Sequence, residues 1–503
     1  MNKMPCQLPY DCHNYIFEYL NDDDDKNTLY SCLLVNSLCC EIAVRILWRD
    51  VWKFCDYDKK HILLSIINTL IAFLPKESKE FLHKNGITIP IQKPPLFNYP
   101  SFCKIISTDK IEVMTRRTLE KRQSIISEDL ENVKYLSQEI LKMFMNQISS
   151  LKVLKCNSCY TKDVKFVCSP RAKICLANLT RLECNSGLKS EFFYQISQIC
   201  HNIQSLYIDF GFNIINGLAD LISLQNNLKI VMLRNFKNKL FDKIIHSLVK
   251  HSFSLTRLIL VECDLNLSFI AMFKNLQVLN LYYQDFNNSN FDQLQYIRFL
   301  KLKILKFIFR RDLNYSSHHY KMLINFLEIN GKILTQLYIY GYHNDSLNIA
   351  LSKFCPNLKN LCTLFKKNES ETLKLILNNC QYLEIIKVRY GDEWFNGKTI
   401  FKVLANYSQK YFYGLNLNCY YSKIVDKLHE ELEEFFINWQ DHISQRSLSL
   451  IINTGYSKNV ISEVYGKGMK TTIDKYMKLG IIKKFETEEC GFIDQYSEFR
   501  TSI

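Results

Sequence analysis

Apolar positions recur along most of the chain in one short pattern, apolar-x-x-apolar-x-apolar. Eleven copies can be read, from LKVLKC at 151–156 to FYGLNL at 412–417, and the second apolar position advances from Leu154 to Leu415 in ten steps over 261 residues, a mean of about 26. The last two apolar positions of each copy alternate as in a short strand with one buried face. Between several copies lie stretches with apolar residues at helical spacing, such as 238–251 and 369–382. The pattern predicts a series of strand–helix units.

A unit of this length falls within the range of roughly 20 to 29 residues that is typical of leucine-rich repeats. One such unit cannot bury its own apolar face, so the units are expected to stack. We therefore predict an α/β fold, a leucine-rich-repeat solenoid in which short parallel strands and helices form a horseshoe, preceded by a small all-α domain. Outward strand residues would line the concave, target-binding face: Lys155, Glu183, Tyr207, Met232, Ile259, Asn280, Lys306, Tyr338 and Lys387.

Cysteines follow the same repeat. Cys200, Cys355 and Cys380 each stand three residues before the first apolar position of a copy, while Cys263 stands three residues beyond the last strand position of its copy. A small buried thiol can pack at such a place and donate weakly to a neighbouring backbone carbonyl. This arrangement resembles the cysteine-containing subclass of leucine-rich repeats.

The pair Cys156 and Cys159 has the C-x-x-C spacing that forms half of many structural zinc sites. Cys168 and Cys175 follow, but six residues separate them and no histidine lies near. The repeat alone accounts for the spacing, because Cys156 occupies the last strand position and Cys159 stands where Cys263 does. We favour this interpretation over zinc and expect no metal site.

The first 50 residues are predicted to form three short helices, which can scarcely bury a core of their own. The segment resembles an F-box, which opens with Leu-Pro and an acidic residue and ends in a Leu-Trp pair. Two usual features are replaced, because Asn36 stands where a Cys commonly follows the Val, and Cys39 where a Trp is usual. The resemblance implies an adaptor-binding set: Leu8, Pro9, Asp11, Ile16, Phe17, Leu20, Leu29, Val35 and Trp48.

An F-box-like start followed by leucine-rich repeats resembles the substrate receptors of SCF-type E3 ubiquitin ligases. In that family the F-box docks a cullin-associated adaptor, the repeats hold the target protein, and transfer chemistry resides in other subunits. The resemblance therefore implies a chain that is not an enzyme, with no catalytic residues and no cofactor. The alternative is a ligase-independent repeat scaffold that binds proteins or nucleic acid.

Composition limits the partners. The net charge of +14 is concentrated in residues 151–310, with 21 Lys+Arg against 10 Asp+Glu. A basic face can meet nucleic acid, acidic lipid or an acidic or phosphorylated protein, or it can simply be solvated. Nineteen cysteines without a visible secretory signal indicate a reducing compartment. We expect an intracellular protein of the cytoplasm, the nucleus or both, with no membrane partner.

These observations predict four regions. They are an F-box-like domain at 1–53, a mainly helical connector at 54–147, the solenoid of about eleven repeats at 148–420, and a C-terminal capping region at 421–503. The last contains an amphipathic helix around 423–440 and a strand-like LSLII.

Overall fold

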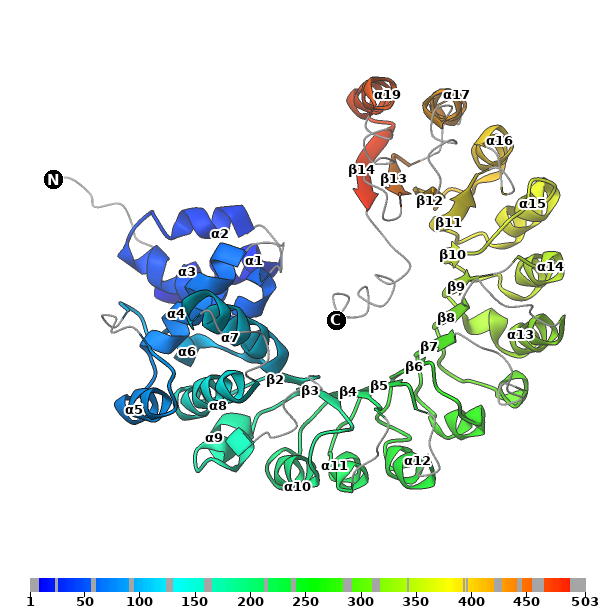
Figure 1. Cartoon of the computed structure of the whole chain (residues 1–503). Coiled ribbons are helices and arrows are strands. Elements are labelled where there is room, and N and C mark those ends of the chain that lie inside the picture. The colour runs from blue at the N-terminus through cyan, green and yellow to red at the C-terminus, as the bar shows by residue number, and fades with distance from the viewer. Residues whose placement is uncertain are drawn as a thin grey trace. The chain divides into compact units, whose positions relative to one another are not determined.

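The computed structural model describes residues 9–22, 26–55, 60–89, 95–123, 130–157, 165–211, 216–236, 241–283, 292–309, 317–341, 343–391, 394, 397–419, 428–440, 446–454 and 466–488. The chain divides into two compact units, Met1–His251 and Ser252–Ile503. Figure 1 traces the elements of both units in chain order.

The first unit begins with helices. Those of the N-terminal region are α1 (Tyr10–Asp22), α2 (Lys26–Cys32), α3 (Ser37–Arg49) and the 3-10 helix η1 (Val51–Phe54). The predicted connector contains α4 (Lys60–Ala72), α5 (Lys76–Lys84), α6 (Tyr99–Phe102), α7 (Thr108–Gln123) and α8 (Leu130–Gln147). The predicted boundary between residues 53 and 54 falls inside η1.

Five parallel strands follow one another in the first unit. They are β1 (Ile105–Ser107), β2 (Val153–Cys156), β3 (Arg181–Asn185), β4 (Ser205–Asp209) and β5 (Ile230–Arg234), and each pairs with the next. The helices after β2 are η2 (Lys165–Cys168), α9 (Ala172–Leu176), α10 (Ser190–Ile199), α11 (Leu218–Ser223) and α12 (Phe241–Val249). Strand β1 lies in the predicted connector, so pairing begins before the first predicted repeat.

The second unit repeats the arrangement with nine parallel strands. They are β6 (Arg257–Val261), β7 (Val278–Tyr283), β8 (Ile304–Phe309), β9 (Gln336–Tyr340), β10 (Asn360–Cys362), β11 (Ile385–Tyr390), β12 (Gly414–Cys419), β13 (Leu448–Asn453) and β14 (Ile482–Glu488). The helices between them are η3 (Leu267–Met272), η5 (Leu294–Tyr296), α13 (Ser317–Asn330), η6 (Gly331–Ile333), α14 (Asp345–Phe354), α15 (Ser370–Asn379), α16 (Gly397–Tyr407), α17 (Leu428–Gln440) and α19 (Lys467–Lys478).

Each of the eleven sequence motifs contains a strand, and the apolar positions point as predicted. In β9, Leu337 and Ile339 are buried while Gln336, Tyr338 and Tyr340 are partly exposed. The buried residues of each strand pack toward the helices, which lie on one side of the strands in the second unit (Figure 1). Sequential parallel strands joined by short helices confirm the predicted α/β leucine-rich-repeat fold. Strands β13 and β14 extend the sheet into the predicted capping region.

A polar side chain at the exit of several helices links each repeat to the one before it. The thiols of Cys200 and Cys380 point to the carbonyl oxygens of Leu176 and Cys355, at 3.3 and 3.2 Å. These bonds confirm the predicted role of the buried cysteines. Other residues do the same in neighbouring repeats: Gln225, His251 and Asn330 contact the carbonyl oxygens of Cys200, Ile222 and Ile297.

Among the described residues, no helix combines the length and apolarity that crossing a bilayer requires.

Candidate functional site

Helices α1, α2 and α3 form a small domain with a core of its own. Phe17, Leu29, Cys39, Ile42, Ala43 and Ile46 are buried together, and Leu20 packs against them. Phe17 and Leu29 therefore cannot contact a partner without unfolding, and their part in adaptor binding would be to hold the helices. Trp48 is half-buried against the ring of Tyr99, with 4.5 Å between centroids. Leu8 lies outside the described residues.

The two residues that depart from the F-box pattern have structural roles. Asn36 is the N-cap of α3, and its Oδ1 accepts a hydrogen bond from the backbone N–H of Cys39 at 2.8 Å. An asparagine at this position satisfies a backbone donor that the helix leaves open. Cys39 itself is a core residue of the domain. The replacements thus preserve the start of α3.

The remaining predicted residues are exposed, and further apolar side chains are exposed with them. Pro9, Asp11, Ile16 and Val35 face solvent. Tyr15 and Tyr19 on α1 are 76% and 63% exposed, and Leu34 beside Val35 in the turn after α2 is 90% exposed. We call Tyr15, Ile16, Tyr19, Leu34 and Val35 the apolar surface. Exposed apolar groups gathered on a domain whose core is already buried indicate a binding role.

The three-helix domain is joined to the first strands of its unit. The indole N–H of Trp52 in η1 donates to the carbonyl oxygen of Ile105 in β1 at 2.6 Å, and the N–H of Lys104 donates to the carbonyl oxygen of Arg49 at 3.0 Å. Burial raises the pKa of the Asp50 carboxyl, and the charge of Lys155 on β2 offsets part of this shift. The helices that carry the apolar surface therefore have a fixed attachment to the sheet.

The nine residues predicted for target binding occupy equivalent strand positions. In the first unit Lys155, Glu183, Tyr207 and Met232 are successive partners in register. In the second unit Ile259, Asn280, Lys306 and Tyr338 are successive partners, and Cys362 on β10 stands between Tyr338 and Lys387. The structure thus brings them together as one row within each unit.

Five members of this row are not surface residues, which corrects the prediction that all nine offer contacts. Glu183, Tyr207, Met232, Ile259 and Asn280 are buried. The carboxylate of Glu183 is engaged by its neighbours, with Arg181 Nη2 at 2.9 Å and Lys155 Nζ at 3.4 Å. The Arg181 guanidinium also covers the Tyr207 ring at 4.4 Å.

Four members of the row remain accessible for a partner: Lys155, Lys306, Tyr338 and Lys387 are partly exposed. The ammonium of Lys306 lies 4.7 Å from the centre of the Tyr338 ring. What is left of the predicted face is therefore mainly cationic and aromatic.

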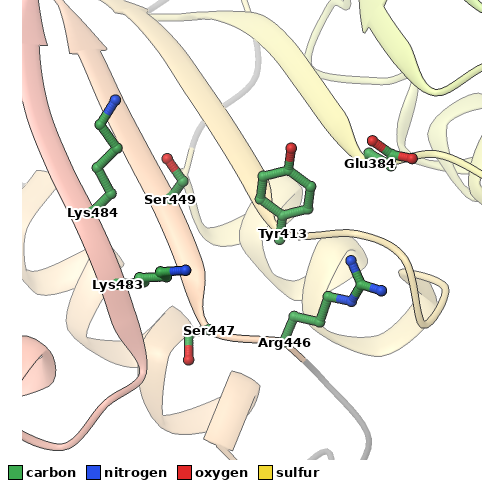
Figure 2. Close-up of a pocket in the computed structure, with 7 residues that line it drawn as sticks. All are labelled: Glu384, Tyr413, Arg446, Ser447, Ser449, Lys483 and Lys484. Carbon is green, nitrogen blue, oxygen red and sulfur yellow. The ribbon is translucent and has the colours of Figure 1, made fainter. Parts of the chain in front are cut away.

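A pocket of about 990 Å³ opens where strands β11 to β14 begin. Figure 2 shows its lining: Glu384, Tyr413, Arg446, Ser447, Ser449, Lys483 and Lys484. The lining holds three cations and one carboxylate, and that carboxylate accepts from Lys359 Nζ at 2.9 Å. We call this the basic pocket. Sequence reasoning missed it by assigning 421–503 to capping alone, since nothing in the linear pattern shows that these residues converge.

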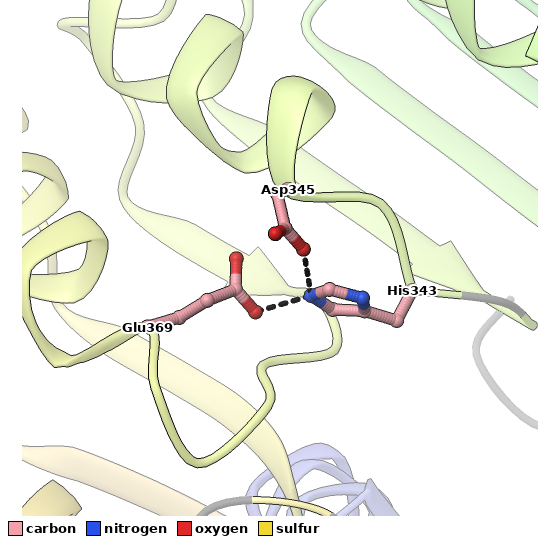
Figure 3. Close-up of side chains that lie close together, drawn as sticks. All are labelled: His343, Asp345 and Glu369. Atoms are coloured by element: carbon pink, nitrogen blue, oxygen red, sulfur yellow. Dashed lines mark hydrogen bonds and ion pairs between the residues drawn. The ribbon is translucent and has the colours of Figure 1, made fainter.

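A second polar cluster joins two loops of the second unit (Figure 3). The Nε2 atom of His343 contacts the carboxylates of both Asp345, at 3.0 Å, and Glu369. Burial alone would raise the pKa of Glu369, but hydrogen bonds from His343, the Asn348 amide and the Lys366 N–H outweigh it and lower the pKa below its usual value. The charged form of Glu369 is thereby stabilised.

The same three residues form the one group among the described residues that could hold a metal ion, because their ligand atoms lie within 4.8 Å of one another. Both oxygens of Glu369 already accept other hydrogen bonds, from Asn348 Nδ2 at 3.0 Å and Lys366 N at 2.7 Å. The arrangement is complete as a hydrogen-bonded link between the loops that precede α14 and α15.

The cysteines of the segment with the C-x-x-C spacing lie in different environments. Cys156 and Cys175 are buried, Cys168 is exposed, and Cys159 lies outside the described residues. Burial raises the pKa of Cys175 to about 12 and that of Cys156 well above its ordinary value. Burial therefore favours the protonated form of both thiols in the folded protein.

Comparison with known proteins finds only distant structural similarity. No family model and no curated protein matches the chain. The crystal structure of the yeast Rad7 and Elc1 complex is similar at 14% identity, covering 85% of this chain and 90% of that chain with a TM-score of 0.36. The leucine-rich repeat-containing protein LegL7 from Legionella pneumophila is similar at 12% identity, covering 66% and 94%, with a TM-score of 0.31. Scores this low add no argument, and the fold rests on the strand order described above.

Proposed function

We propose that this chain is a non-catalytic substrate receptor of an SCF-type ubiquitin ligase, in which helices α1 to α3 dock the cullin-associated adaptor and the strand faces hold the target. The observation that carries the proposal is the apolar surface. Leu34 is 90% exposed and Val35 65% exposed, on a domain that already buries an apolar core of its own. A stable monomer gains nothing from such side chains, whereas a docking partner buries them.

The resemblance of the sequence to an F-box supports the choice of partner. Ile16 and Val35, two positions of that pattern, belong to the apolar surface, and Pro9 and Asp11 are exposed at the start of α1. The exposed part of the strand row, with its lysines and Tyr338, supports protein binding on the repeats. Repeat arrays of this type use extended strand faces as binding surfaces.

Capture of the chain by the purified adaptor subunit tests the proposal. We expect the wild type to be retained and the double variant Ile16→Ala, Val35→Ala to lose most of this binding, because a few buried anchors usually supply most of the interface energy. A matched control is Leu300→Ala in the second unit, since Leu300 is 71% exposed and belongs to no predicted site.

Circular dichroism would verify that the variants stay folded, which their exposure predicts. No capture of the wild type, or equal capture of the wild type and the double variant, would refute the proposal. The chain would then remain a repeat scaffold that works without a ligase.

A further inference from the structure

Small residues occupy two paired strand positions at the basic pocket. Gly414 on β12 and Ser449 on β13 are partners in register, and Ile385 on β11 is the next partner of Gly414. A Cβ at Gly414 would lie 2.6 Å from Ile385 Cγ1, so the position admits only glycine without rearrangement. The Ile385 side chain therefore covers Gly414, and of the two small residues it is Ser449 that lines the pocket.

A register shift places two lysines together at the rim. Leu448 pairs with Ile482 and the next residue, Ser449, pairs with Lys484, so Lys483 is an extra residue in β14. Such a bulge re-aims side chains that would otherwise alternate between faces. Figure 2 shows Lys483 and Lys484 both at the pocket, with Ser449 on the adjacent strand, Ser447 just before that strand begins, and Arg446 beside Tyr413.

These cations are available to a ligand. Among the described residues, Arg446 and Lys483 have no carboxylate partner within ion-pair distance, and Lys484 pairs only with Glu486, at 2.9 Å. The Lys484–Glu486 pair is about half exposed on both sides, and pairs of that kind contribute at most about 1 kcal/mol. The hydroxyls of Ser449 and Tyr413 add neutral donors around the same hollow, whereas the Ser447 hydroxyl donates to the carbonyl oxygen of Gly480 at 2.7 Å.

We propose that the basic pocket binds the phosphate group of a phosphorylated serine or threonine in the target protein. A phosphate monoester carries about −1.5 to −2 charges and three acceptor oxygens, which matches three cations and two hydroxyls better than a single carboxylate does. The carboxylate of Glu384 in the lining interrupts the positive charge that a continuous sugar–phosphate backbone would follow, which favours a single phosphate group over nucleic acid. This inference rests on the proposed function, because it names the class of target protein that the receptor would bind.

Fluorescence anisotropy with the full chain tests the inference. The probe is a labelled phosphoserine peptide library with random flanks, compared with the same library unphosphorylated and with a single-stranded RNA. We expect preference for the phosphorylated library and competition by inorganic phosphate. Lys484→Gln and Arg446→Gln should each weaken binding about tenfold or more, as expected when a charge-assisted hydrogen bond is lost.

Two further variants sharpen the test. Ser449→Asp places a carboxylate in the hollow and should abolish binding, while Lys332→Gln removes an exposed lysine of the same unit outside the pocket and should leave binding unchanged. Equal binding of both peptide libraries, or equal binding by wild type and pocket variants, would overturn the inference. So would tighter binding of RNA that the phosphorylated peptides do not displace.

The assay contains no adaptor, so its result is separable from the proposed function. Loss of peptide binding in pocket variants that still capture the adaptor supports both proposals. Phosphopeptide binding by a chain that never captures the adaptor leaves the pocket assignment standing and removes only the ligase role.

Discussion

Gln225 shows how one side chain can connect two repeats. Its Oε1 accepts from the N–H of Ile203 at 2.9 Å, and its Nε2 donates to the carbonyl oxygens of Cys200 at 2.9 Å and Leu221 at 2.8 Å. The side chain is buried, so water cannot replace these partners. Gln225 therefore makes the bond to the preceding repeat that a cysteine thiol makes in other repeats, and it makes two further bonds with the same amide group.

We predict that Gln225→Ala lowers the free energy of unfolding by about 1 to 3 kcal/mol, because it leaves the buried N–H of Ile203 without an acceptor. Urea unfolding followed by circular dichroism would measure the change. The control is Asn226→Ala at the next position, where the side chain is exposed and its only side-chain bond is 3.4 Å long. Equal effects of the two substitutions would contradict this assignment.

The sequence predicted only some of the residues that leave a helix and bond the preceding repeat. Cys200, Cys355 and Cys380 were found because a repeated cysteine is conspicuous, while Gln225 and Asn330 were not, although they bond backbone groups of the preceding repeat in the same way. The geometry selects any buried donor of suitable length, so a search by residue identity finds only part of the set.

Between elements, the link from His343 to Glu369 connects the loops before two successive helices, α14 and α15. Because the pKa of Glu369 is lower in the folded protein than in the unfolded chain, the folded state binds fewer protons at this site. The link contributes stability above the unfolded pKa of a glutamate, about 4.3, and this contribution is lost as pH falls through the lower, folded value.

We expect Glu369→Gln to destabilise the protein at pH 6 and to reduce the loss of stability between pH 5 and pH 3. Urea midpoints measured across that range would show the difference. Glu371→Gln is the control, since Glu371 follows closely on α15 and its side chain is 78% exposed. A steeper loss of stability in acid for Glu369→Gln than for wild type would show that the sign is wrong.

The sequence predicted the positions of the strands, but it did not predict the solvent accessibility of their side chains. Periodicity locates all eleven strand motifs because each must bury two apolar residues. It cannot say which outward residues are covered by neighbours, as Glu183 is by Lys155 and Arg181. Nor can it reveal the register shift at Lys483, which depends on pairing between β13 and β14.

At the largest scale, helices α1 to α3 are attached firmly to the rest of the first unit. The bond from Trp52 to Ile105 and the bond from Lys104 to Arg49 join them to the first strand of their unit. An adaptor bound to the apolar surface would therefore be held at a fixed orientation to strands β1 to β5. Sequence predicted a connector there, but the backbone contacts that fix the geometry come from residues about 50 positions apart.

The buried cysteines have a practical consequence for both units. Burial raises the pKa values of Cys184, Cys200, Cys380 and Cys419 to about 12, so these thiols carry almost no reactive thiolate at neutral pH. Cys12, by contrast, is exposed. Alkylation of the native protein should modify exposed cysteines such as Cys12 and Cys168 first, and reach these four buried thiols only when their own repeat opens.

Mass spectrometry after timed alkylation would give one opening rate for each modified cysteine. Rates for Cys200 and Cys380 equal to that of Cys12 would contradict the expectation. Otherwise the thiols that stabilise the repeats also serve as intrinsic reporters of local unfolding, spaced along the chain without any engineered label.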